Sequence, residues 1–294
     1  MDVQDASPDG RSNLPRPFSP FRVMNSPISV VIPVYNEARA LELVLWGFCR
    51  QSCRDFELFI ADDGSGPEVH DLVEAFSSRA PVPVRYTRHA DEGFRRSAIL
   101  NRAVRESAAP YLVFADADCI PHSKFVEAHR TYRAPRSVLC GRRVQLSERL
   151  SAQLTREDVL AGRLERLAAV RMLYSLSGGG GHWDEGLVIR NSALHRWINC
   201  KEPYLLGSNF SLDRSLFEEV NGFNEDFVGY GGEDTELEYR LRLAGARFAW
   251  VRHRAIQYHL YHVARTGRPA NDEILRQTQA MGKAACTNGL RKDL

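Results

Sequence analysis

The chain has no strong excess of charge of either sign, and its cysteines are few and scattered. Its 39 lysines and arginines and 37 acidic residues leave a formal net charge of +2 over 294 residues. This balance argues against binding to nucleic acid or to an anionic membrane by bulk attraction. The six cysteines include no Cys-x-x-Cys pair, and several lie in apolar segments. They favour free thiols in a reducing compartment over a disulfide framework.

Long hydrophobic runs are also absent. No apolar stretch approaches the roughly 20 residues that a membrane-spanning helix needs, and the first residues lack the apolar core of a signal peptide. We therefore expect a cytoplasmic protein. Residues 1–26 are rich in Pro, Ser, Asp and Gly and predict a disordered leader. No G-x-G-x-x-G follows the first apolar run, which argues against a common dinucleotide-binding fold.

What the chain does contain is an alternation of apolar strands and amphipathic helices. β-Branched or aromatic runs predict strands at 28–34, 56–61, 82–87 and 111–114, with further strands at 138–144 and 250–262. Helical periodicity predicts helices over 41–48, 99–104, 124–132, 151–173, 233–244 and 271–285. This order predicts an α/β domain with a doubly wound, mostly parallel sheet.

Two local details complete the expected helices. Asn36 is the expected N-cap of the first helix. Leu160, Leu164 and Leu167 are expected to form one packed stripe of the helix over 151–173. Four consecutive glycines at 178–181 then predict either a linker or a mobile lid.

Acidic pairs follow two of the predicted strands at the point where each strand ends. Asp62 and Asp63 follow the second strand in a glycine turn, and Asp116 and Asp118 follow the fourth. Ligands bind at the C-terminal ends of strands in open α/β sheets. Carboxylate oxygens there suit Mg²⁺ or Mn²⁺ carrying a phosphate-bearing substrate. From its own segment, the pair Asp116 and Asp118 is explained equally well as a cap of the next helix.

A second acidic centre follows a glycine-rich turn. Residues 229–232 include three glycines and precede Glu233 and Asp234, in the first turn of a predicted helix. The helix dipole alone would favour both acids there. The crowding of glycines and aromatic residues indicates instead a shaped pocket, in which a carboxylate acts as a general base. Two late histidines, His259 and His262, indicate a metal role when combined with these acids.

In their order along the chain, five segments resemble the family 2-type glycosyltransferases of the GT-A fold: VVIPVYNEA, DDGS, DEGFRRSAILNRA, FADADCIPH and GGEDTELEYRLRLAG. The likeness covers roughly residues 28–262. The C-terminal part is similar to the β1,4-galactosyltransferase and chondroitin-polymerase type. The resemblance implies a catalytic domain over 27–265, divided into a nucleotide-binding half (27–145) and an acceptor and catalytic half (146–265), with a C-terminal helix and tail over 266–294.

The resemblance also implies a role for each matched residue. Asp118 and His262 would bind Mn²⁺ or Mg²⁺, with His259 as a further candidate ligand and Asp116 facing the ribose or the metal's water. Asp234 would deprotonate the acceptor hydroxyl. The residues expected at the donor nucleotide or its sugar are Pro33, Tyr35, Glu37, Asp62, Asp63, Arg96, Asn101, Asp116, Asn209 and Glu233.

The implied reaction moves a hexose or N-acetylhexosamine from a UDP-sugar to a hydroxyl of a glycan or glycoconjugate, without a nucleic-acid partner. A single displacement inverts the anomeric carbon and needs one base. The QxxRW motif of processive synthases is absent, which favours single-sugar transfer. Peripheral membrane association through a lipid-linked acceptor stays open, and 151–183 is expected to shape the acceptor site. The alternative is a catalytically inactive nucleotide-sugar-binding or scaffold protein, against which Asp118, Asp234 and His262 together argue.

Overall fold

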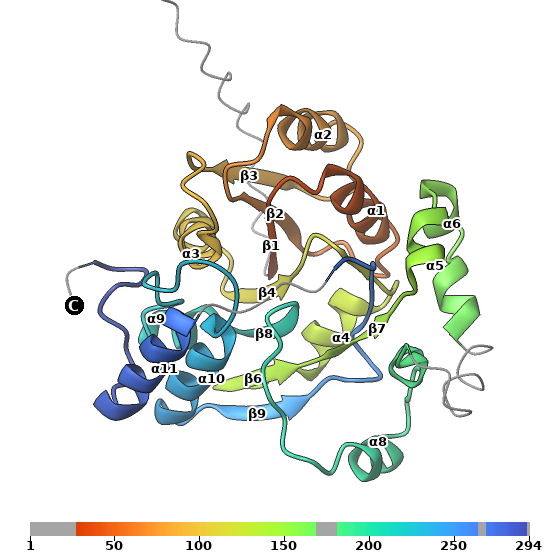
Figure 1. Ribbon diagram of the computed structural model, residues 1–294. Helices are drawn as coiled ribbons and strands as arrows, with labels where there is room; N and C mark the ends of the chain where they lie inside the picture. Colours follow the sequence, from red (N-terminus) through yellow and green to blue (C-terminus); the bar gives the residue numbers. More distant parts are fainter. Residues whose placement is uncertain (1–27, 169–180, 264–268, 293–294) are drawn as a thin grey trace, which may run out of the picture.

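The computed structural model describes residues 28–168, 181–263 and 269–292. The predicted leader over 1–26, the end of the predicted helix over 151–173 and the glycines at 178–180 lie outside these ranges. The described chain forms two β-sheets with helices packed around them (Figure 1). Among its helices, none is both long enough and apolar enough to cross a membrane.

The larger sheet has seven strands in the order β3-β2-β1-β4-β8-β6-β9. Its first four strands are those predicted from the apolar runs: β1 (Ile28–Val34), β2 (Glu57–Asp62), β3 (Val84–Arg88) and β4 (Tyr111–Ala115). They pair in parallel, and three helices connect them: α1 (Ala38–Cys49), α2 (Pro67–Ser77) and α3 (Arg96–Glu106). Because helices cover both faces of this part, β1, β2 and β4 are mainly apolar and buried, and the predicted doubly wound arrangement is confirmed.

The other three strands of this sheet come from later in the chain: β6 (Ser137–Cys140), β8 (Asn209–Asp213) and β9 (Arg247–Trp250). β8 runs antiparallel to both neighbours, β4 and β6, whereas β6 and β9 are parallel. The sheet is therefore mostly parallel, as predicted, with one reversed strand in its interior.

A smaller sheet was not predicted. It consists of β5 (Cys119–Pro121), β10 (Ile256–His259) and β7 (Arg142–Gln145), in that order. The single strands predicted over 138–144 and 250–262 are both wrong, because each divides between the two sheets. At Gly141, between β6 and β7, an added Cβ would collide with the Asn209 side chain. The chain therefore changes sheets at a residue without a side chain.

The remaining helices include α4 (Phe125–Tyr132), α5 (Glu148–Gln153), α6 (Arg156–Leu160), the 3₁₀ helix η1 (Trp183–Gly186), α8 (Ser192–Ile198), α9 (Arg214–Glu219), α10 (Glu233–Leu243) and α11 (Pro269–Met281). Residues 163–168 are also helical. The continuous helix predicted from residue 151 is wrong in its described part. Thr155 starts a new helix through a capping box, and Gly162 has a φ of 70°. Leu160 consequently lies 40% exposed, away from buried Leu164.

The predicted N-cap of α1 is also wrong. Asn36 has a φ of 53° and lies one residue before the cap, Glu37. Its side-chain Oδ1 accepts a hydrogen bond from the Gly66 N–H at 2.8 Å, and its own N–H donates to Ser65 Oγ at 2.9 Å. Asn36 therefore joins the loop after β1 to the loop after β2, which places two expected donor-binding segments side by side.

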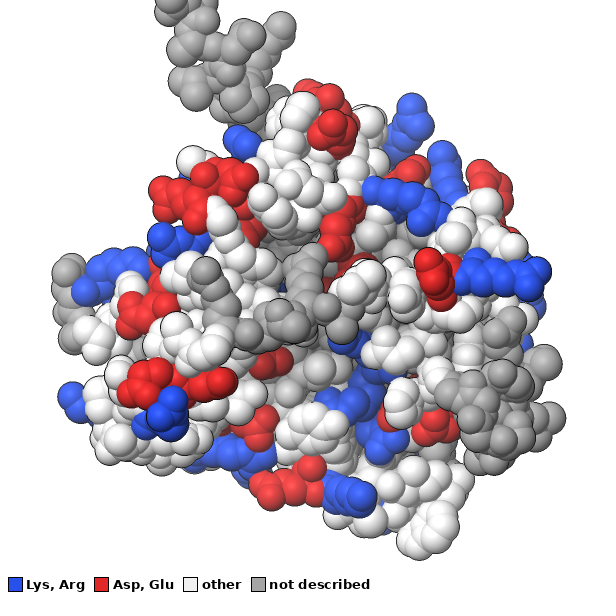
Figure 2. All heavy atoms as spheres, viewed as in Figure 1, with Lys and Arg blue, Asp and Glu red and all other residues white. Residues whose placement is uncertain are grey.

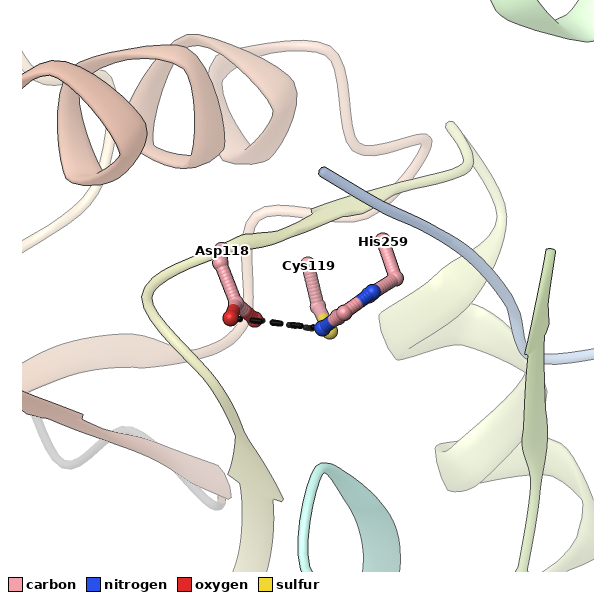
Figure 3. A group of neighbouring side chains, drawn as sticks. All are labelled: Asp118, Cys119 and His259. Carbon is pink, nitrogen blue, oxygen red and sulfur yellow. Dashed lines mark hydrogen bonds and ion pairs between the residues drawn. The ribbon is translucent and has the colours of Figure 1, made fainter. Parts of the chain in front are cut away.

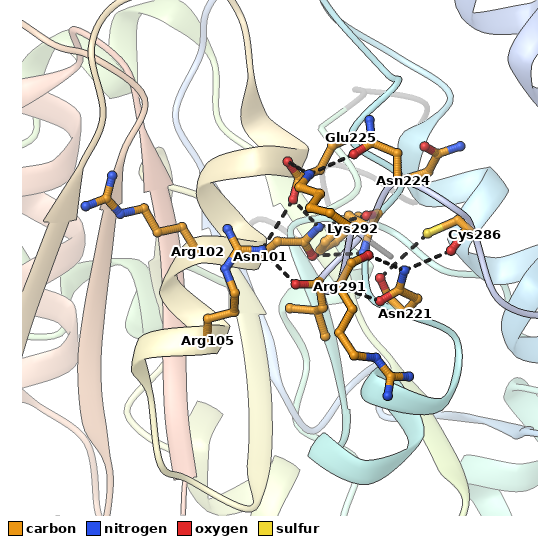
Figure 4. A network of polar contacts seen from close by, with 12 residues as sticks. Asn101, Arg102, Arg105, Asn221, Asn224, Glu225, Cys286, Arg291 and Lys292 are labelled. Atoms are coloured by element: carbon orange, nitrogen blue, oxygen red, sulfur yellow. Dashed lines mark hydrogen bonds and ion pairs between the residues drawn. The ribbon is translucent and has the colours of Figure 1, made fainter. Parts of the chain in front are cut away.

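The C-terminal tail packs against the turn between α9 and α10 (Figure 4). Asn221, fully buried with a φ of 61°, donates through Nδ2 to the carbonyls of Cys286 and Arg291 at 2.8 and 2.9 Å. Its Oδ1 accepts from the Arg291 N–H at 2.8 Å, and Lys292 Nζ lies 2.6 Å from Glu225 Oε2. The tail thus supports the segment that leads toward Glu233 and Asp234.

Candidate active site

One cleft collects most of the predicted site residues. It lies at the C-terminal ends of β1, β2 and β4, and the first turn of α10 and the end of β10 also line it. In Figure 2, basic side chains gather in the hollow below the centre of this face. All but three of the predicted residues line the cleft: Pro33, Tyr35, Glu37, Asp63, Arg96, Asp116, Asp118, Glu233, Asp234, His259 and His262.

Asp118 forms one side of the cleft with two histidines, and we call Asp118, His259 and His262 the histidine side. The Nε2 atoms of both histidines lie 3.3 Å from Asp118 Oδ2. Strand pairing explains this, because His259 in β10 lies opposite Cys119 in β5, directly after Asp118. Figure 3 shows Asp118, Cys119 and His259 converging, and their ligand atoms all lie within 4.8 Å of one another.

Each imidazole of the histidine side is oriented through its other nitrogen. His259 Nδ1 lies 2.8 Å from Gln145 Oε1, and His262 Nδ1 lies 2.8 Å from the Val263 carbonyl. Because a carbonyl oxygen only accepts, Nδ1 of each ring is the donor in these contacts, and Nε2 is the nitrogen that faces Asp118. Nε2 of His259 is buried without a hydrogen-bond partner. This donor set fits a divalent metal ion, with Gln145 orienting one ligand from behind.

The electrostatics of Asp118 agree with a ligand role. Burial acts to raise the pKa of this carboxyl, but the contacts with His259 and His262 outweigh burial and hold the pKa below its ordinary value. The carboxylate is therefore ionised at neutral pH, as a metal ligand must be.

Asp116 faces the opposite way, toward two arginines, and we call Asp116, Arg96 and Arg143 the arginine side. Arg96 Nη2 donates to Asp116 Oδ1 at 2.8 Å, and Arg143 Nη1 lies 3.8 Å from Asp116 Oδ2. Arg96 also donates to the Gly207 carbonyl at 3.2 Å. Two nearby cations therefore compensate the charge of Asp116.

The acids of α10 approach the arginine side. Asp234 Oδ2 accepts a hydrogen bond from the Gly207 N–H at 3.1 Å, and Glu233 Oε1 lies 3.6 Å from Arg96 Nη1. Glu233 Oε2 is buried without a partner. Burial raises the pKa of Glu233, and the nearby Arg96 only partly opposes this effect. Gly232, with a φ of 94° at the N-cap of α10, provides the backbone turn that aims both acids inward.

The far end of the cleft contains Tyr35 and Asp63. Tyr35 donates through its hydroxyl to Asp91 Oδ2 at 3.2 Å. Asp63 accepts from the Arg95 N–H at 2.9 Å and lies 2.6 Å from His89 Nε2. Burial raises the pKa of Asp63, although these two hydrogen bonds counteract it. The cleft therefore offers a polar pocket at this end, separate from the metal-ligand set.

Asp62 turns away from the cleft. It is fully buried, its Oδ1 accepts from the Ser65 N–H at 2.8 Å, and its Oδ2 accepts from the Tyr86 hydroxyl. The expectation of a donor contact from Asp62 is corrected, because both carboxylate oxygens stabilise the turn that carries Asp63.

Asn101 and Asn209 also lie outside the cleft. Asn101 donates to the Phe223 carbonyl at 2.8 Å and accepts from the Phe223 N–H at 3.0 Å. Asn209 donates to the carbonyls of Arg142 and Ala255 at 2.9 and 3.0 Å. Both side chains are fully buried and fully used within the fold. They join segments around the site, which corrects the expectation that they contact the donor.

Several cleft residues were missed by the sequence reasoning. Arg143 comes from β7, which was predicted as part of a single strand over 138–144, and Gly207 was not singled out. An added Cβ at Gly207 would lie 3.3 Å from Arg96 and 3.4 Å from Asp234, so a side chain there would crowd the Arg96 guanidinium. Further lining residues are Phe94, Leu206, Ser208 and Tyr230.

Two protein-family models match this chain. The one described as glycosyl transferase family 2 matches residues 29–220. The one described as N-terminal domain of galactosyltransferase matches residues 193–263.

Similar proteins agree with these matches. Chondroitin synthase from Escherichia coli is 26% identical over 79% of this chain and 34% of its own length. Validoxylamine A glucosyltransferase from Streptomyces hygroscopicus subsp. jinggangensis is 30% identical over 74% of this chain and 52% of its own length. The chain thus spans between about a third and a half of these relatives.

A solved structure extends the likeness to the fold. The mannosyltransferase PcManGT from Pyrobaculum calidifontis, in complex with GDP-Man and Mn²⁺, aligns with a TM-score of 0.53 at 16% identity, over 90% of this chain and 73% of that one. The predicted GT-A fold is confirmed, and so is the predicted likeness of the C-terminal part to the galactosyltransferase and chondroitin-polymerase type.

Proposed function

The chain belongs to glycosyl transferase family 2, and on this premise we propose that it is an inverting, metal-dependent glycosyltransferase. It transfers a hexose or N-acetylhexosamine from a UDP-sugar to a hydroxyl of a glycan or glycoconjugate. The observation that carries the proposal is the composition of one cleft, which contains the histidine side and, on a separate element, the carboxylate of Asp234. A metal-ligand set and a general base are the two groups that this reaction needs.

The histidine side holds the ion. Asp118, His259 and His262 are the ligands, and their mixed oxygen and nitrogen donors favour Mn²⁺ over Mg²⁺, which prefers oxygen ligands alone. The bound ion would neutralise charge on the diphosphate of the leaving nucleotide. Arg96 and Arg143 add positive charge close to the same position.

The proton transfer belongs to Asp234. Its Oδ2 is held by the Gly207 N–H, so the carboxylate has a fixed direction. It takes the proton of the acceptor hydroxyl while the oxygen attacks the anomeric carbon and the bond from that carbon to the diphosphate breaks. Attack from the face opposite the leaving group inverts the configuration in one step, so no covalent sugar intermediate is needed. Glu233 beside it accepts hydrogen bonds from the donor sugar.

The nucleotide occupies the other end of the cleft. Tyr35, Glu37 and Asp63 bind the uridine, and Asp116 faces the ribose. The catalytic unit extends over residues 27–265. The free cysteines support its placement in the reducing cytoplasm.

A donor screen tests the nucleotide. The protein is incubated with UDP-, GDP- and TDP-sugars and Mn²⁺, and both thermal stabilisation and sugar release are followed. We expect stabilisation by UDP-sugars that disappears with a chelator. Stabilisation by a GDP-sugar alone would contradict the uridine assignment.

Asp234→Asn tests the base. The variant should keep Mn²⁺-dependent UDP binding and lose transfer by about 10²- to 10⁴-fold. The exposed Asp71→Asn serves as the matched control and should transfer normally. Unchanged turnover of Asp234→Asn would remove this residue from the base role. Nucleotide-sugar binding by the unaltered chain, without transfer to any acceptor or hydrolysis, would favour the inactive binding protein.

A further inference from the structure

The short helix α8 has its apolar face on the outside. Leu194, Trp197 and Ile198 are 44%, 76% and 37% exposed. Their spacing of i, i+3 and i+4 places them on one side of the helix. The one buried residue of α8 is a polar one, His195, whose Nε2 lies 2.9 Å from the Arg252 carbonyl. A surface helix normally packs its apolar stripe on the core. In α8 the apolar stripe faces outward and a polar residue faces the core.

The charge around this stripe has one sign. Residues 188–201 contain Arg190, Arg196 and Lys201 and no acidic residue. All three cations are exposed, and Arg190 and Lys201 flank the two ends of the helix. The nearest acid after the stretch, Glu202, lies 2.5 Å from Arg242. The exposed Val188 extends the apolar surface before the helix.

The position of α8 makes this surface accessible. The helix lies at the margin of the molecule, beyond the edge strand β9 (Figure 1), and Figure 2 shows an uncharged protrusion there. The segment after it is anchored, since Trp250 Nε1 donates to the Lys201 carbonyl at 2.7 Å and the Arg142 guanidinium lies 3.5 Å from the centre of the Tyr204 ring. The same segment continues to Leu206, Gly207 and Ser208 in the cleft wall.

We propose that α8 is a docking surface for an anionic lipid bilayer. Trp197, Leu194 and Ile198 enter the headgroup region, where an aromatic ring with a polar N–H is favourable. Arg190 and Lys201 contact anionic headgroups on either side. Charge complementarity selects this partner, because exposed basic residues on either side of an outward apolar stripe match a negatively charged surface. The segment after α8 leads directly to Leu206 in the cleft wall, so docking through α8 brings the cleft close to the membrane. The membrane contact itself does not depend on which donor the enzyme uses or on which residue is the base.

Vesicle binding tests the proposal on the full chain. We expect co-sedimentation with vesicles of phosphatidylcholine and phosphatidylglycerol, weaker binding to phosphatidylcholine alone, and a loss of binding as salt is raised. Trp197→Ser should weaken binding about ten-fold, and Arg190→Gln and Lys201→Gln several-fold each. Met281→Ser, which removes a 62% exposed apolar side chain from α11, is the control and should bind normally.

A second readout locates the contact. Quenching of tryptophan fluorescence by brominated acyl chains should be seen in the unaltered protein and largely lost in Trp197→Phe. Absence of binding to anionic vesicles overturns the proposal, and so does binding that Trp197→Ser leaves unchanged. If the protein is a dimer in solution and Trp197→Ser makes it monomeric, the face is a protein interface and the proposal is also overturned.

Discussion

Asp116 and Asp118 are identical side chains two residues apart, yet they belong to opposite sides of the cleft. On the histidine side, Asp118 faces the Nε2 atoms of two imidazoles. On the arginine side, Asp116 is held by two guanidinium groups. The first arrangement fits a divalent cation. The second is already compensated, so it can position a ligand without needing an ion.

The division between the two sides follows from the two sheets. Asp116 directly follows β4 of the larger sheet, whereas Asp118 directly precedes β5 of the smaller one. β5 pairs with β10, which supplies His259, and β10 pairs with β7, which supplies both Gln145 and Arg143. One short connection between sheets therefore gives each carboxylate its own environment.

The largest expected effect comes from Asp118→Asn. It removes the ionised ligand of the histidine side while keeping its shape, and we expect transfer to fall by about 1000-fold. Metal titration of UDP binding should show the cause. Asp116→Asn is the matched variant and should leave the metal affinity nearly unchanged. Equal losses of metal affinity in both variants would contradict the division described above.

Gln145→Leu tests whether metal binding by the histidine side depends on the hydrogen bond between His259 and Gln145. Without the Oε1 acceptor, the His259 ring is no longer held with its Nε2 atom toward Asp118. We expect the metal affinity to fall about 10- to 100-fold, with turnover largely recovered at saturating Mn²⁺. The metal concentration for half-maximal activity is the measurement. A loss of turnover that added metal does not restore would contradict the prediction, because it would show that Gln145 does not act through metal affinity.

Asn271→Ala tests whether the hydrogen bond from α11 to the glycine-rich turn before α10 helps to position Glu233 and Asp234. Asn271 in α11 is buried and donates to the carbonyl of Gly231, two residues before Glu233, at 2.7 Å. Losing one such hydrogen bond, worth about 1 kcal/mol, should lower kcat/KM about five-fold and leave the metal requirement unchanged. Thr278→Val removes another buried hydrogen bond of α11. It is the control for a general loss of packing between α11 and the rest of the domain. A changed metal requirement in Asn271→Ala would contradict this prediction, because it would show that the turn before α10 also affects metal binding by the histidine side.

The smallest expected effect is a gain in stability from Glu233→Gln. Burial raises the pKa of Glu233 above its ordinary value of 4.5, so its charged form opposes folding. The variant should therefore melt about 2 °C higher at neutral pH. The advantage is present above the raised pKa and disappears as the pH falls below 4.5. Melting temperatures across this range measure it, and an advantage that grows toward acid pH would contradict the assignment.

The fold was predictable where the hydrophobic pattern of a segment matches the burial of that segment in the folded domain. The strands β1, β2 and β4 are mainly apolar because both sheet faces are covered, and α1 and α3 follow helical periodicity. The helix α2 was not predicted. The prediction failed at Gly141 and around residues 251–255, where a single extended segment leaves one sheet and enters another. Alternation along a strand carries no information about which sheet it joins.

The candidate site divides in the same way. Asp118, Asp234 and His262 were predicted because their residue types and order resemble a known family. Asn101 and Asn209 matched the same segments, but their amides are used to join backbone segments, and a sequence does not say which way an amide points. Arg143 and Gln145 carried no signal, because they matter only through the pairing of β7 with β10.

The sequence by itself determined the α/β class, the family and the acids at the ends of the strands, since apolar periodicity and motif order are local properties. Only the tertiary structure decided that Asp118 meets His259 and His262 while Asp116 meets Arg96 and Arg143. It also decided that α8 carries its apolar stripe outward. These outcomes depend on contacts between residues far apart in the chain, whose pairing is set by the packing of whole elements.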